Sequence, residues 1–229
     1  MLTYSLETMS TKAQAIATLR QMNIGDKFAH LPMPKAAVLI PLFVREEKLH
    51  TLMTLRSTEL RTSAGEVCFP GGKRDLSDRD DVETALREAQ EEIGLQPDQV
   101  EVLCQLTPII NKSGLMVTPV VGFIDEDFSP SPNPAEVSAV FTVPLDLFTQ
   151  EKNHSQVQGI TGLSVPIHSF NYMDPDSDSQ YQIWGLTAVL AILVAVCALQ
   201  KKTEFEVTFE FDNPLHFFEQ NLLRRVSKL

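Results

Sequence analysis

The chain of 229 residues has few cysteines and few basic residues, and each shortage excludes a class of protein. Its three cysteines, Cys68, Cys104 and Cys197, stand far apart without a C-x-x-C pair. This pattern favours buried thiols in a reducing compartment over a disulfide framework. Only 19 lysine and arginine residues stand against 30 aspartate and glutamate residues, which gives a formal net charge of −11. Because non-specific nucleic-acid binding needs a basic surface, the acidity excludes nucleic acid as a bulk partner.

Other absences concern how the chain is organised. It has no internal repeat, no low-complexity stretch and no linker long enough to separate two domains. The first 20 residues lack a basic segment followed by an apolar one, so no secretory signal is expected. With 43% hydrophobic residues, the chain is long enough to bury a real core in one domain.

Hydrophobic patterning predicts several strands with two prominent helices between them, which is an α+β arrangement in one domain. A short helix is expected over residues 8–19. Strict alternation over residues 204–211, EFEVTFEF, predicts a half-buried strand near the end of the chain. Apolar or alternating segments predict further strands over residues 37–44, 49–56, 99–106, 117–124 and 165–172.

The segment 183–199 is a run of 17 residues without a charge, and it permits two interpretations. Its length is at the lower limit for a membrane span. Its alanines recur at helical spacing, a small-residue stripe that lets a helix lie close against a neighbour. Polar residues precede the run and a strand-like segment follows it, so a buried helix that crosses the sheet is favoured over a membrane span.

The strongest chemical signal lies between Phe69 and Leu95, where a glycine-containing loop precedes an acidic helix. Pro70-Gly71-Gly72 permits a tight turn and close approach of a ligand. Asp80 and Glu83 have the spacing of a helix start, and Gly94 stands where a helix would end. One apolar stripe, at the spacing of a core-facing helix surface, consists of Val82, Ala85, Leu86, Ala89 and Ile93.

Glu88, Glu91 and Glu92 lie off that stripe, and the spacing predicts that their carboxylates converge on one exposed flank. They are either a solvated polar face or a cation site. Like charges at this spacing repel each other, and locally only Arg87 offsets them. Hard oxygen ligands suit Mg²⁺ or Mn²⁺, which proteins often hold with carboxylates and substrate phosphates.

These residues carry a resemblance to a known family. Residues 87–95, REAQEEIGL, match the R-E-U-x-E-E-x-G-U half of the Nudix box, in which U is aliphatic or small. The first half departs from the pattern, because the loop is one residue longer and Asp78 stands where glutamate is usual. The chain is therefore identified as a member of the Nudix hydrolase family, and the resemblance implies a Nudix fold, a mixed β-sheet sandwiched between α-helices.

An upstream motif narrows the resemblance to one branch of the family. Residues 52–57 (LMTLRS), with Arg61, Gly65 and residues 69–72 (FPGG), resemble a motif of the coenzyme A diphosphatases. Met53 in place of leucine is the one departure, and the branch shares the longer loop. The implied organisation is an N-terminal extension with a short helix over residues 1–36, a Nudix domain over 37–212 and a C-terminal tail over 213–229.

The resemblance implies hydrolysis of the diphosphate bond in coenzyme A or acyl-coenzyme A with Mg²⁺ or Mn²⁺. The products would be adenosine 3′,5′-bisphosphate and phosphopantetheine or acyl-phosphopantetheine. Glu88 and Glu92 would bind the metal, and Glu91 would be either a third ligand or the base. Arg87 completes the predicted catalytic set through an ion pair to a loop acid such as Asp78. Other possible functions are hydrolysis of ADP-ribose or NADH, and an inactive acyl-coenzyme A-binding role.

Candidate substrate-binding residues follow from the phosphates of coenzyme A. Arginine and lysine side chains match phosphate groups, so Arg56, Arg61 and Lys73 are the candidates, with ordinary surface charge as the alternative. Gly71 and Gly72 are further substrate-binding candidates, and the resemblance implies that a backbone carbonyl of these glycines completes the metal shell.

Two further residue groups have weaker predicted roles. Glu136 is a candidate distal acid, although a surface loop position is an equal alternative. Ser227, Lys228 and Leu229 spell S-K-L, the peroxisomal address, which predicts an import receptor as partner and a matrix location. A frayed polar tail is the alternative for these three residues.

The acidic composition has a local source. Residues 72–95 hold eight acidic and four basic residues, so this segment supplies −4 of the net charge of −11. Acidity that seems hostile to a phosphorylated ligand is in part a means of holding the cations that bind one.

Overall fold

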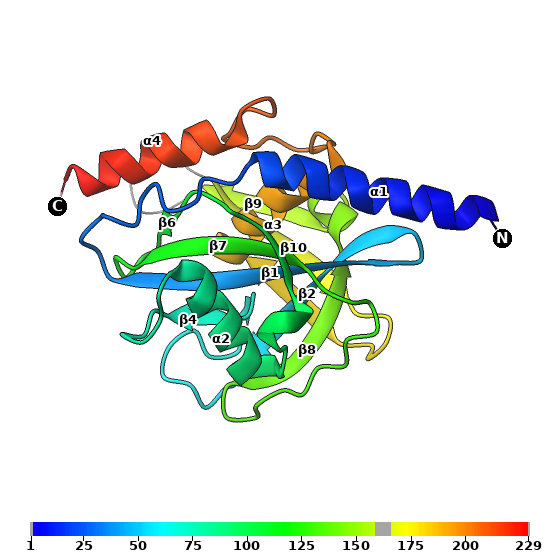
Figure 1. The fold of residues 1–229 in the computed structure, drawn as a ribbon, viewed down its shortest axis with the longest axis horizontal. Coiled ribbons are helices and arrows are strands. Elements are labelled where there is room, and N and C mark those ends of the chain that lie inside the picture. The colour runs from blue at the N-terminus through cyan, green and yellow to red at the C-terminus, as the bar shows by residue number, and fades with distance from the viewer. Residues whose placement is uncertain (1, 159–165, 229) are drawn as a thin grey trace.

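A mixed β-sheet with helices on both faces forms the body of the computed structural model, which describes residues 2–158 and 166–228 (Figure 1). The helices are α1 (Leu2–Gln21), α2 (Asp81–Ile93), α3 (Gly185–Leu199) and α4 (Pro214–Val226), with short 3₁₀ turns η1 (Pro97–Gln99) and η2 (Leu145–Thr149). The strands are β1 (Lys35–Arg45), β2 (Lys48–Arg56), β3 (Val67–Cys68), β4 (Gly71–Lys73), β5 (Glu101–Gln105), β6 (Ile109–Ile110), β7 (Met116–Phe123), β8 (Val137–Pro144), β9 (His154–Gln158), β10 (Pro166–Met173) and β11 (Gln180–Trp184).

Strand β1 lies at the centre of the main sheet. The sheet runs β3-β2-β1-β7-β5, with β4 paired to β1, β6 to β7 and β8 to β2. The pairing of β1 with β7 is parallel and the other pairings are antiparallel. Every residue of β7 is buried, as expected for a strand covered on both faces. The α+β class predicted from the sequence is confirmed.

A second sheet of three strands, β11-β10-β9, packs beside the first. The rings of Phe141 on β8 and Tyr181 on β11 stack across the junction, with centroids 3.7 Å apart. Such aromatic pairs contribute about 0.5–1.5 kcal/mol beyond the burial of their area. The junction therefore ties the small sheet to the edge of the large one.

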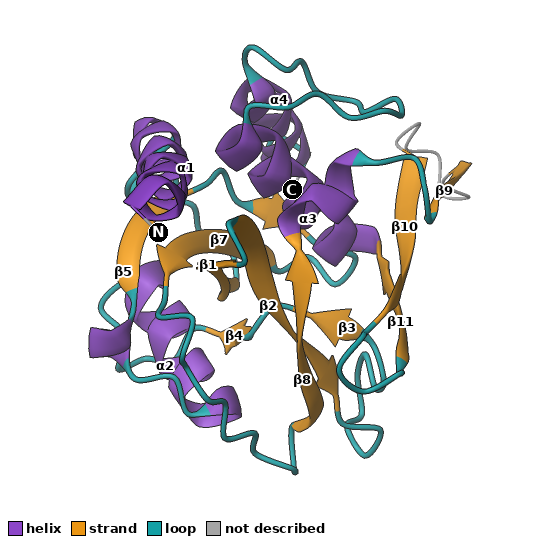
Figure 2. Ribbon diagram, turned by 90° about the vertical axis from the view of Figure 1, so that its right-hand side faces the viewer, coloured by secondary structure: helices purple, strands orange, loops and turns teal. Residues whose placement is uncertain are grey.

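Helices α2 and α3 cover opposite faces of the main sheet (Figure 2). On one face, α2 buries Ala85, Ala89 and Ile93 against β1 and β7. On the other face, α3 packs with α1, η2 and β10 in the larger hydrophobic cluster. The sheet thus lies between helical layers.

The apolar run predicted as a buried helix forms the end of β11 and then α3. Ten of the 15 residues of α3 are buried, including every residue from Leu190 to Ala198. The small-residue stripe lies in this core, where Ala188, Ala191 and Ala195 are fully covered. In the described part of the chain, no helix combines the length and the apolarity that a membrane crossing requires.

Some predicted elements differ from those observed. The strand expected over residues 204–211 is wrong, because in the described part of the chain no backbone ladder pairs this segment with a strand. The segment does lie beside β9, where the Phe205 ring stacks on that of His154 with centroids 3.6 Å apart. Its alternation is nevertheless real: Phe205, Val207 and Phe209 are covered while the intervening residues are exposed. Helix α1 is longer than the expected 8–19, and α4 and β8 are elements that the patterning did not predict. All three cysteines are free, as predicted.

Candidate active site

Local signals in the sequence set the position of α2. The Asp80 carboxylate accepts a hydrogen bond from the Glu83 backbone N–H at 2.8 Å, which caps the first turn. Gly94 ends the helix with a left-handed φ of 75°. The predicted apolar stripe faces the sheet, with Ala85, Ala89 and Ile93 fully buried. The flank that carries the glutamates is therefore turned toward the glycine loop.

Gly71 and Gly72 lie directly against that flank. Strand β4 pairs with β1 through Val38↔Gly71 and Ala37↔Gly72, so the loop is fixed by the sheet. A side chain at Gly72 would overlap the carboxyl group of Glu88. Only glycine permits this approach of backbone to carboxylate. The sequence predicts close approach of a ligand at these glycines. The structure shows the close approach of the Glu88 carboxyl on α2, and the ligand contact stays a prediction.

Arg87 holds the loop that precedes α2. Its guanidinium donates two hydrogen bonds to the Asp78 carboxylate, from Nε and Nη2, both at 2.9 Å. Nη2 also donates to the Lys73 carbonyl at 3.1 Å. Nη1 donates to Glu88 at 3.0 Å and to Glu91 at 3.1 Å. The predicted ion pair between Arg87 and a loop acid is confirmed.

Asp78 is buried and fully partnered. Besides Arg87, its carboxylate accepts hydrogen bonds from the Asp75 backbone N–H at 2.8 Å and from the Thr84 hydroxyl at 2.9 Å. The Arg87 guanidinium, with these other donors, holds the pKa of the Asp78 carboxyl well below its usual range. The same bonds raise the pKa of Arg87. Aspartate in this position is thus a structural anchor.

Glu92 departs from the prediction of an exposed flank, because its side chain is only 3% exposed. Its Oε2 accepts a hydrogen bond from the Gly71 N–H at 3.1 Å, and its Oε1 lies 3.9 Å from Arg56 Nη1. Burial raises the pKa of Glu92 to about 7. The prediction was wrong because helical spacing does not show that the glycine loop covers this side of α2.

Glu88 and Glu91 differ in their burial. The side chain of Glu88 is 14% exposed, and burial raises its pKa although Arg87 opposes the shift. The side chain of Glu91 is 53% exposed and is ion-paired to Arg87. Two of the three glutamates therefore face the glycine loop from within the protein, and the third stands at the solvent edge.

The loop between β7 and β8 brings a fourth carboxylate to the cluster. The Asn133 N–H donates to the Glu92 carbonyl at 2.9 Å, and the Asn133 side chain donates to Glu136 at 3.3 Å. The Glu136 carbonyl accepts from the Ser57 N–H at 2.8 Å, which ties the loop to the end of β2. The charge of Glu136 acts to raise the pKa of both Glu88 and Glu92. The candidate distal acid thus lies at the site.

Comparisons with known proteins agree with this geometry. A family model described as the NUDIX domain matches residues 33–161, more than half of the chain. Peroxisomal coenzyme A diphosphatase NUDT7 of Mus musculus is 45% identical over 215 residues, which cover 93% of this chain and 91% of that protein. The chain belongs to the Nudix hydrolase family.

Two further relatives show how far the similarity extends. Nudix hydrolase 15, mitochondrial, of Arabidopsis thaliana is 43% identical over 175 residues, 75% of this chain and 61% of the plant protein. This chain therefore spans less than two thirds of that relative. A crystal structure of a Nudix hydrolase from M. Smegmatis, RenU, is 24% identical, covers 50% of this chain and 72% of that chain, and has a TM-score of 0.44.

The donor set of this Nudix box fits a divalent cation chemically. Across residues 2–158 and 166–228, no three acidic, histidine or cysteine side chains converge in the geometry of a metal site. Arg87 Nη1 instead bridges Glu88 and Glu91. Glu88 and Glu92 are nonetheless covered carboxylates whose negative charges repel each other, and the pKa values of both are raised. Hard oxygen donors with unbalanced negative charge suit Mg²⁺ or Mn²⁺.

The predicted cationic residues divide into two groups. Arg56, at the end of β2, reaches the carboxylates, and its buried Nε has no hydrogen-bond partner among the described residues. Arg61 lies exposed in the loop between β2 and β3, and Lys73 is exposed at the end of β4. The structure thus brings Arg56 to the carboxylates and leaves the side chains of the other two exposed to solvent.

Sequence reasoning assigned no supporting role to two residues that the structure places at the site. The buried Thr84 hydroxyl is bonded to Asp78, and Asn133 links Glu136 to α2. A buried threonine in a first helical turn gives no signal of its own. Of the S-K-L residues at the other end of the chain, Ser227 and Lys228 are exposed after α4, and Leu229 lies outside the described residues.

Proposed function

We propose that this Nudix hydrolase cleaves the diphosphate bond of coenzyme A and acyl-coenzyme A. The products are adenosine 3′,5′-bisphosphate and phosphopantetheine or its acyl derivative. Support comes from the printed name of the mouse relative and from residues 52–72, which resemble the motif of that branch. The observation that carries the proposal is the pair of covered carboxylates, Glu88 and Glu92, pressed against the glycine loop.

Glu88 and Glu92 are proposed to hold Mg²⁺ or Mn²⁺, and Glu91 is close enough along α2 to be a third ligand. When bound, the metal neutralises charge on the diphosphate oxygens and lowers the pKa of a water molecule. Gly71 keeps the Glu92 carboxylate in place through its N–H. Arg87 acts through its bonds to Asp78 and to the Lys73 carbonyl, which keep the loop closed against the helix.

Two carboxylates can take the proton from the attacking water. Glu91 stands at the solvent edge and is ion-paired to Arg87. Glu136 faces Glu88 and Glu92 from the opposite loop. Glu91→Gln and Glu136→Gln separate them, because loss of the base lowers kcat by about 10²–10⁴-fold. The variant that keeps kcat within a few-fold of the parent identifies the carboxylate that is not the base.

Arg56 is proposed to contact a phosphate oxygen of the substrate. Its buried Nε has no hydrogen-bond partner in the part of the chain that the structure describes, and its Nη1 lies 3.9 Å from Glu92 Oε1, too far for a close ion pair. An arginine with free donors beside a diphosphate site matches the geometry of phosphate recognition. Arg61 and Lys73, whose side chains are exposed, would then serve the 3′-phosphate.

A substrate panel tests the proposal directly. Purified protein with Mg²⁺ or Mn²⁺ is given coenzyme A, ADP-ribose and NADH at equal concentrations, and the products are separated by chromatography. Preferential release of adenosine 3′,5′-bisphosphate from coenzyme A supports the proposal. Preference for ADP-ribose or NADH favours the broader Nudix alternative, and binding of acyl-coenzyme A without turnover favours the inactive binding role.

We also propose that the protein acts in the peroxisomal matrix and that an import receptor, which recognises the S-K-L residues, delivers it there. The S-K-L residues and the name of the mouse relative support this location, whereas the Arabidopsis relative is named as mitochondrial. An amino-terminal fluorescent fusion is expected to enter peroxisomes. Loss of that import on removal of Leu229 supports the signal, and unchanged import on its removal contradicts it.

A further inference from the structure

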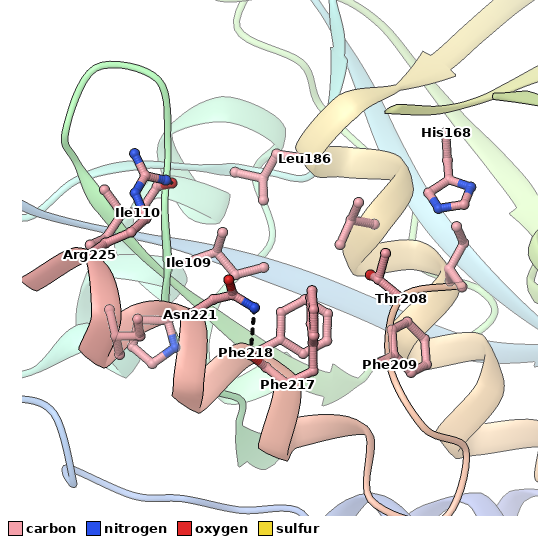
Figure 3. Close-up of a pocket in the computed structure, with 14 residues that line it drawn as sticks. Ile109, Ile110, His168, Leu186, Thr208, Phe209, Phe217, Phe218, Asn221 and Arg225 are labelled. Carbon is pink, nitrogen blue, oxygen red and sulfur yellow. Dashed lines mark hydrogen bonds between the residues drawn. The ribbon is translucent and has the colours of Figure 1, made fainter. Parts of the chain in front are cut away.

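An apolar cavity of about 200 Å³ lies on the face of the sheet opposite α2 (Figure 3). It is enclosed by α3, α4, strand β6 and the segment that contains Thr208 and Phe209. An engineered apolar cavity of about 150 Å³ binds benzene, so this one can accept a chain of several methylenes. Its apolar lining includes Ile109, Leu186, Val189, Phe209, Phe217 and Phe218.

The polar side chains around the cavity are engaged with the protein itself. Asn221 donates to the Phe217 carbonyl at 2.8 Å, the bond drawn in Figure 3. Arg225 donates to the carbonyls of Ile110 and Asn111. His168 is hydrogen-bonded to His154 at 3.0 Å. A ligand that carries its own charged head would have to displace these bonds, so the cavity suits an uncharged apolar chain.

The entrance is formed by apolar residues that are only half covered. Ile109, Leu186, Val189 and Phe217 are each partly exposed although they line an apolar space. Half-exposed apolar side chains around a concave surface are typical of a ligand site. A ligand that fills the space would remove this remaining area from water.

A row of strand-paired residues runs across the sheet from the end of the glycine loop to the lining of the cavity. Lys73, Ala36, Val117 and Ile109 form one row across the sheet, through consecutive strand pairings. Three strand spacings separate Lys73 from Ile109, which is about 14 Å. The first turn of α3 is also joined to the strand before the glycine loop, because the Thr187 hydroxyl donates to the Val67 carbonyl at 3.1 Å.

We propose that this cavity binds the acyl chain of the acyl-coenzyme A substrate. This inference rests on the proposed function, because it takes the diphosphate to lie at the Nudix box. In acyl-coenzyme A the pantetheine arm separates the diphosphate from the thioester by about 14 Å, the length of about four extended residues. An acyl chain therefore needs a subsite remote from the metal ligands, and Ile109 at the cavity lies about that far across the sheet from Lys73 at the end of the glycine loop.

The proposal predicts a dependence of catalysis on chain length. Each methylene that leaves water for the cavity improves kcat/KM by about threefold to fourfold. The gain is expected to rise from acetyl- to hexanoyl- to decanoyl-coenzyme A and to stop when the cavity is full.

The test fills the cavity by substitution. Leu186→Trp and Val189→Phe enlarge half-buried side chains of α3 that line it. Leu199→Phe is the matched control, because Leu199 is also half buried on α3 but does not line the cavity. The ratio of kcat/KM for decanoyl-coenzyme A to that for coenzyme A is expected to fall about tenfold in both filled variants and to stay unchanged in the control. Circular dichroism confirms that each variant folds.

Calorimetry without metal supplies a readout independent of turnover, with decanoyl-coenzyme A, coenzyme A and free decanoate as ligands. Tighter binding of decanoyl-coenzyme A than of coenzyme A, lost in the filled variants, supports the proposal. A chain-length dependence that survives both substitutions overturns it and leaves the proposed function standing. Decanoate binding that equals decanoyl-coenzyme A binding also overturns it, in favour of a separate fatty-acid site. Failure of the parent protein to cleave any thioester or coenzyme A overturns the proposed function instead.

Discussion

Two arginine–carboxylate pairs at α2 differ in how completely they satisfy a buried acid. Asp78 receives two hydrogen bonds from Arg87 at 2.9 Å and two more from Asp75 and Thr84. Glu92 receives one backbone hydrogen bond, and its arginine lies 3.9 Å away. Both carboxylates are buried, with residue exposures of 7% and 2%. The pKa of Asp78 is lowered and that of Glu92 is raised to about 7.

The contrast separates a structural anchor from the proposed metal site within one motif. Burial acts to raise the pKa of both carboxyl groups, and the number of hydrogen bonds to the ionised form decides which of the two stays ionised. The pair of Arg87 and Asp78, here called the saturated pair because every donor and acceptor of the Asp78 carboxylate contact is used, holds the loop to the helix and leaves no donor or acceptor for a ligand. In the pair of Arg56 and Glu92, here called the unsaturated pair, the carboxylate charge lacks a close cation and the Arg56 Nε lacks a partner among the described residues. A bound cation and a phosphate oxygen would supply these two partners.

Neutralising the unsaturated acid should have the largest effect. In Glu92→Gln the side chain keeps its shape and can still accept from Gly71, but it loses the charge that would bind the metal. We expect kcat/KM with coenzyme A to fall by about 10³-fold, as for loss of a main electrostatic group. The melting temperature should stay level or rise, because a costly buried charge is removed. Glu126→Gln, in an exposed loop, is the control. Activity within fivefold of the parent contradicts the ligand role.

Breaking the saturated pair should act mainly on stability. Arg87→Met removes the guanidinium and leaves Asp78 buried without its main partner. Loss of one partner of a buried ion pair costs about 3–5 kcal/mol of the free energy of unfolding. Arg79→Met, which removes an exposed pair with Glu83, should change stability little. Urea unfolding measures both, and equal effects in the two variants would show that the buried pair has no special role.

A side chain added where the glycine loop contacts α2 should lower the free energy of unfolding by a smaller amount. In Gly72→Ala the new methyl group overlaps the Glu88 carboxyl, and overpacking of this kind costs about 1–3 kcal/mol. Glu88→Ala removes the group that is struck, so the double variant should recover most of the loss. A double-mutant cycle in urea measures the coupling. Additive losses would mean that the glycine is needed for another reason.

The smallest effect is expected at His168, away from the box, where burial disfavours the protonated imidazole and so makes stability depend on pH. Burial, with a contribution from His154, lowers the pKa of His168 to about 4. Between pH 4 and the unfolded value of about 6.5 the unfolded chain binds more protons, so stability falls as the pH drops through this window. Relative to His168→Gln, the parent should lose about 1–2 kcal/mol between pH 6.5 and pH 5. His30→Gln, an exposed site, controls the comparison. Parallel pH profiles for the parent and His168→Gln would contradict the assigned cause.

The predicted helix of the box shows which features short-range patterns determine. Asp80, Gly94 and the apolar stripe each act within one or two turns, and the structure confirms all three. The segment 204–211 shows the opposite case. Its alternation correctly divides covered from exposed residues, but a strand also needs a neighbour with free backbone groups, and the pattern carries no information about that neighbour.

The candidate site divides in the same way. The motif gave the identity of the glutamates, the arginine and the glycines, and the pairing of Arg87 with Asp78 followed from it. Glu91 and Glu92 are adjacent in sequence and equal in charge, yet one side chain is 53% exposed and the other 3%. The covering of Glu92 and the arrival of Glu136 depend on two loops that lie in opposite directions along the sequence. Gly71 lies 21 residues before Glu92, and Glu136 lies 44 residues after it.

The sequence by itself determined the chemical class of this protein and the local frame of its site. Residues 87–95 match the Nudix box, and the caps fix the ends of its helix. The acidic excess of residues 72–95 predicts where cations would bind. Tertiary structure alone decided which glutamate is buried, which arginine is left unsatisfied and where an apolar cavity opens on the far face. Capping and periodicity act between near neighbours, whereas burial and pKa depend on segments that only the folded chain brings together.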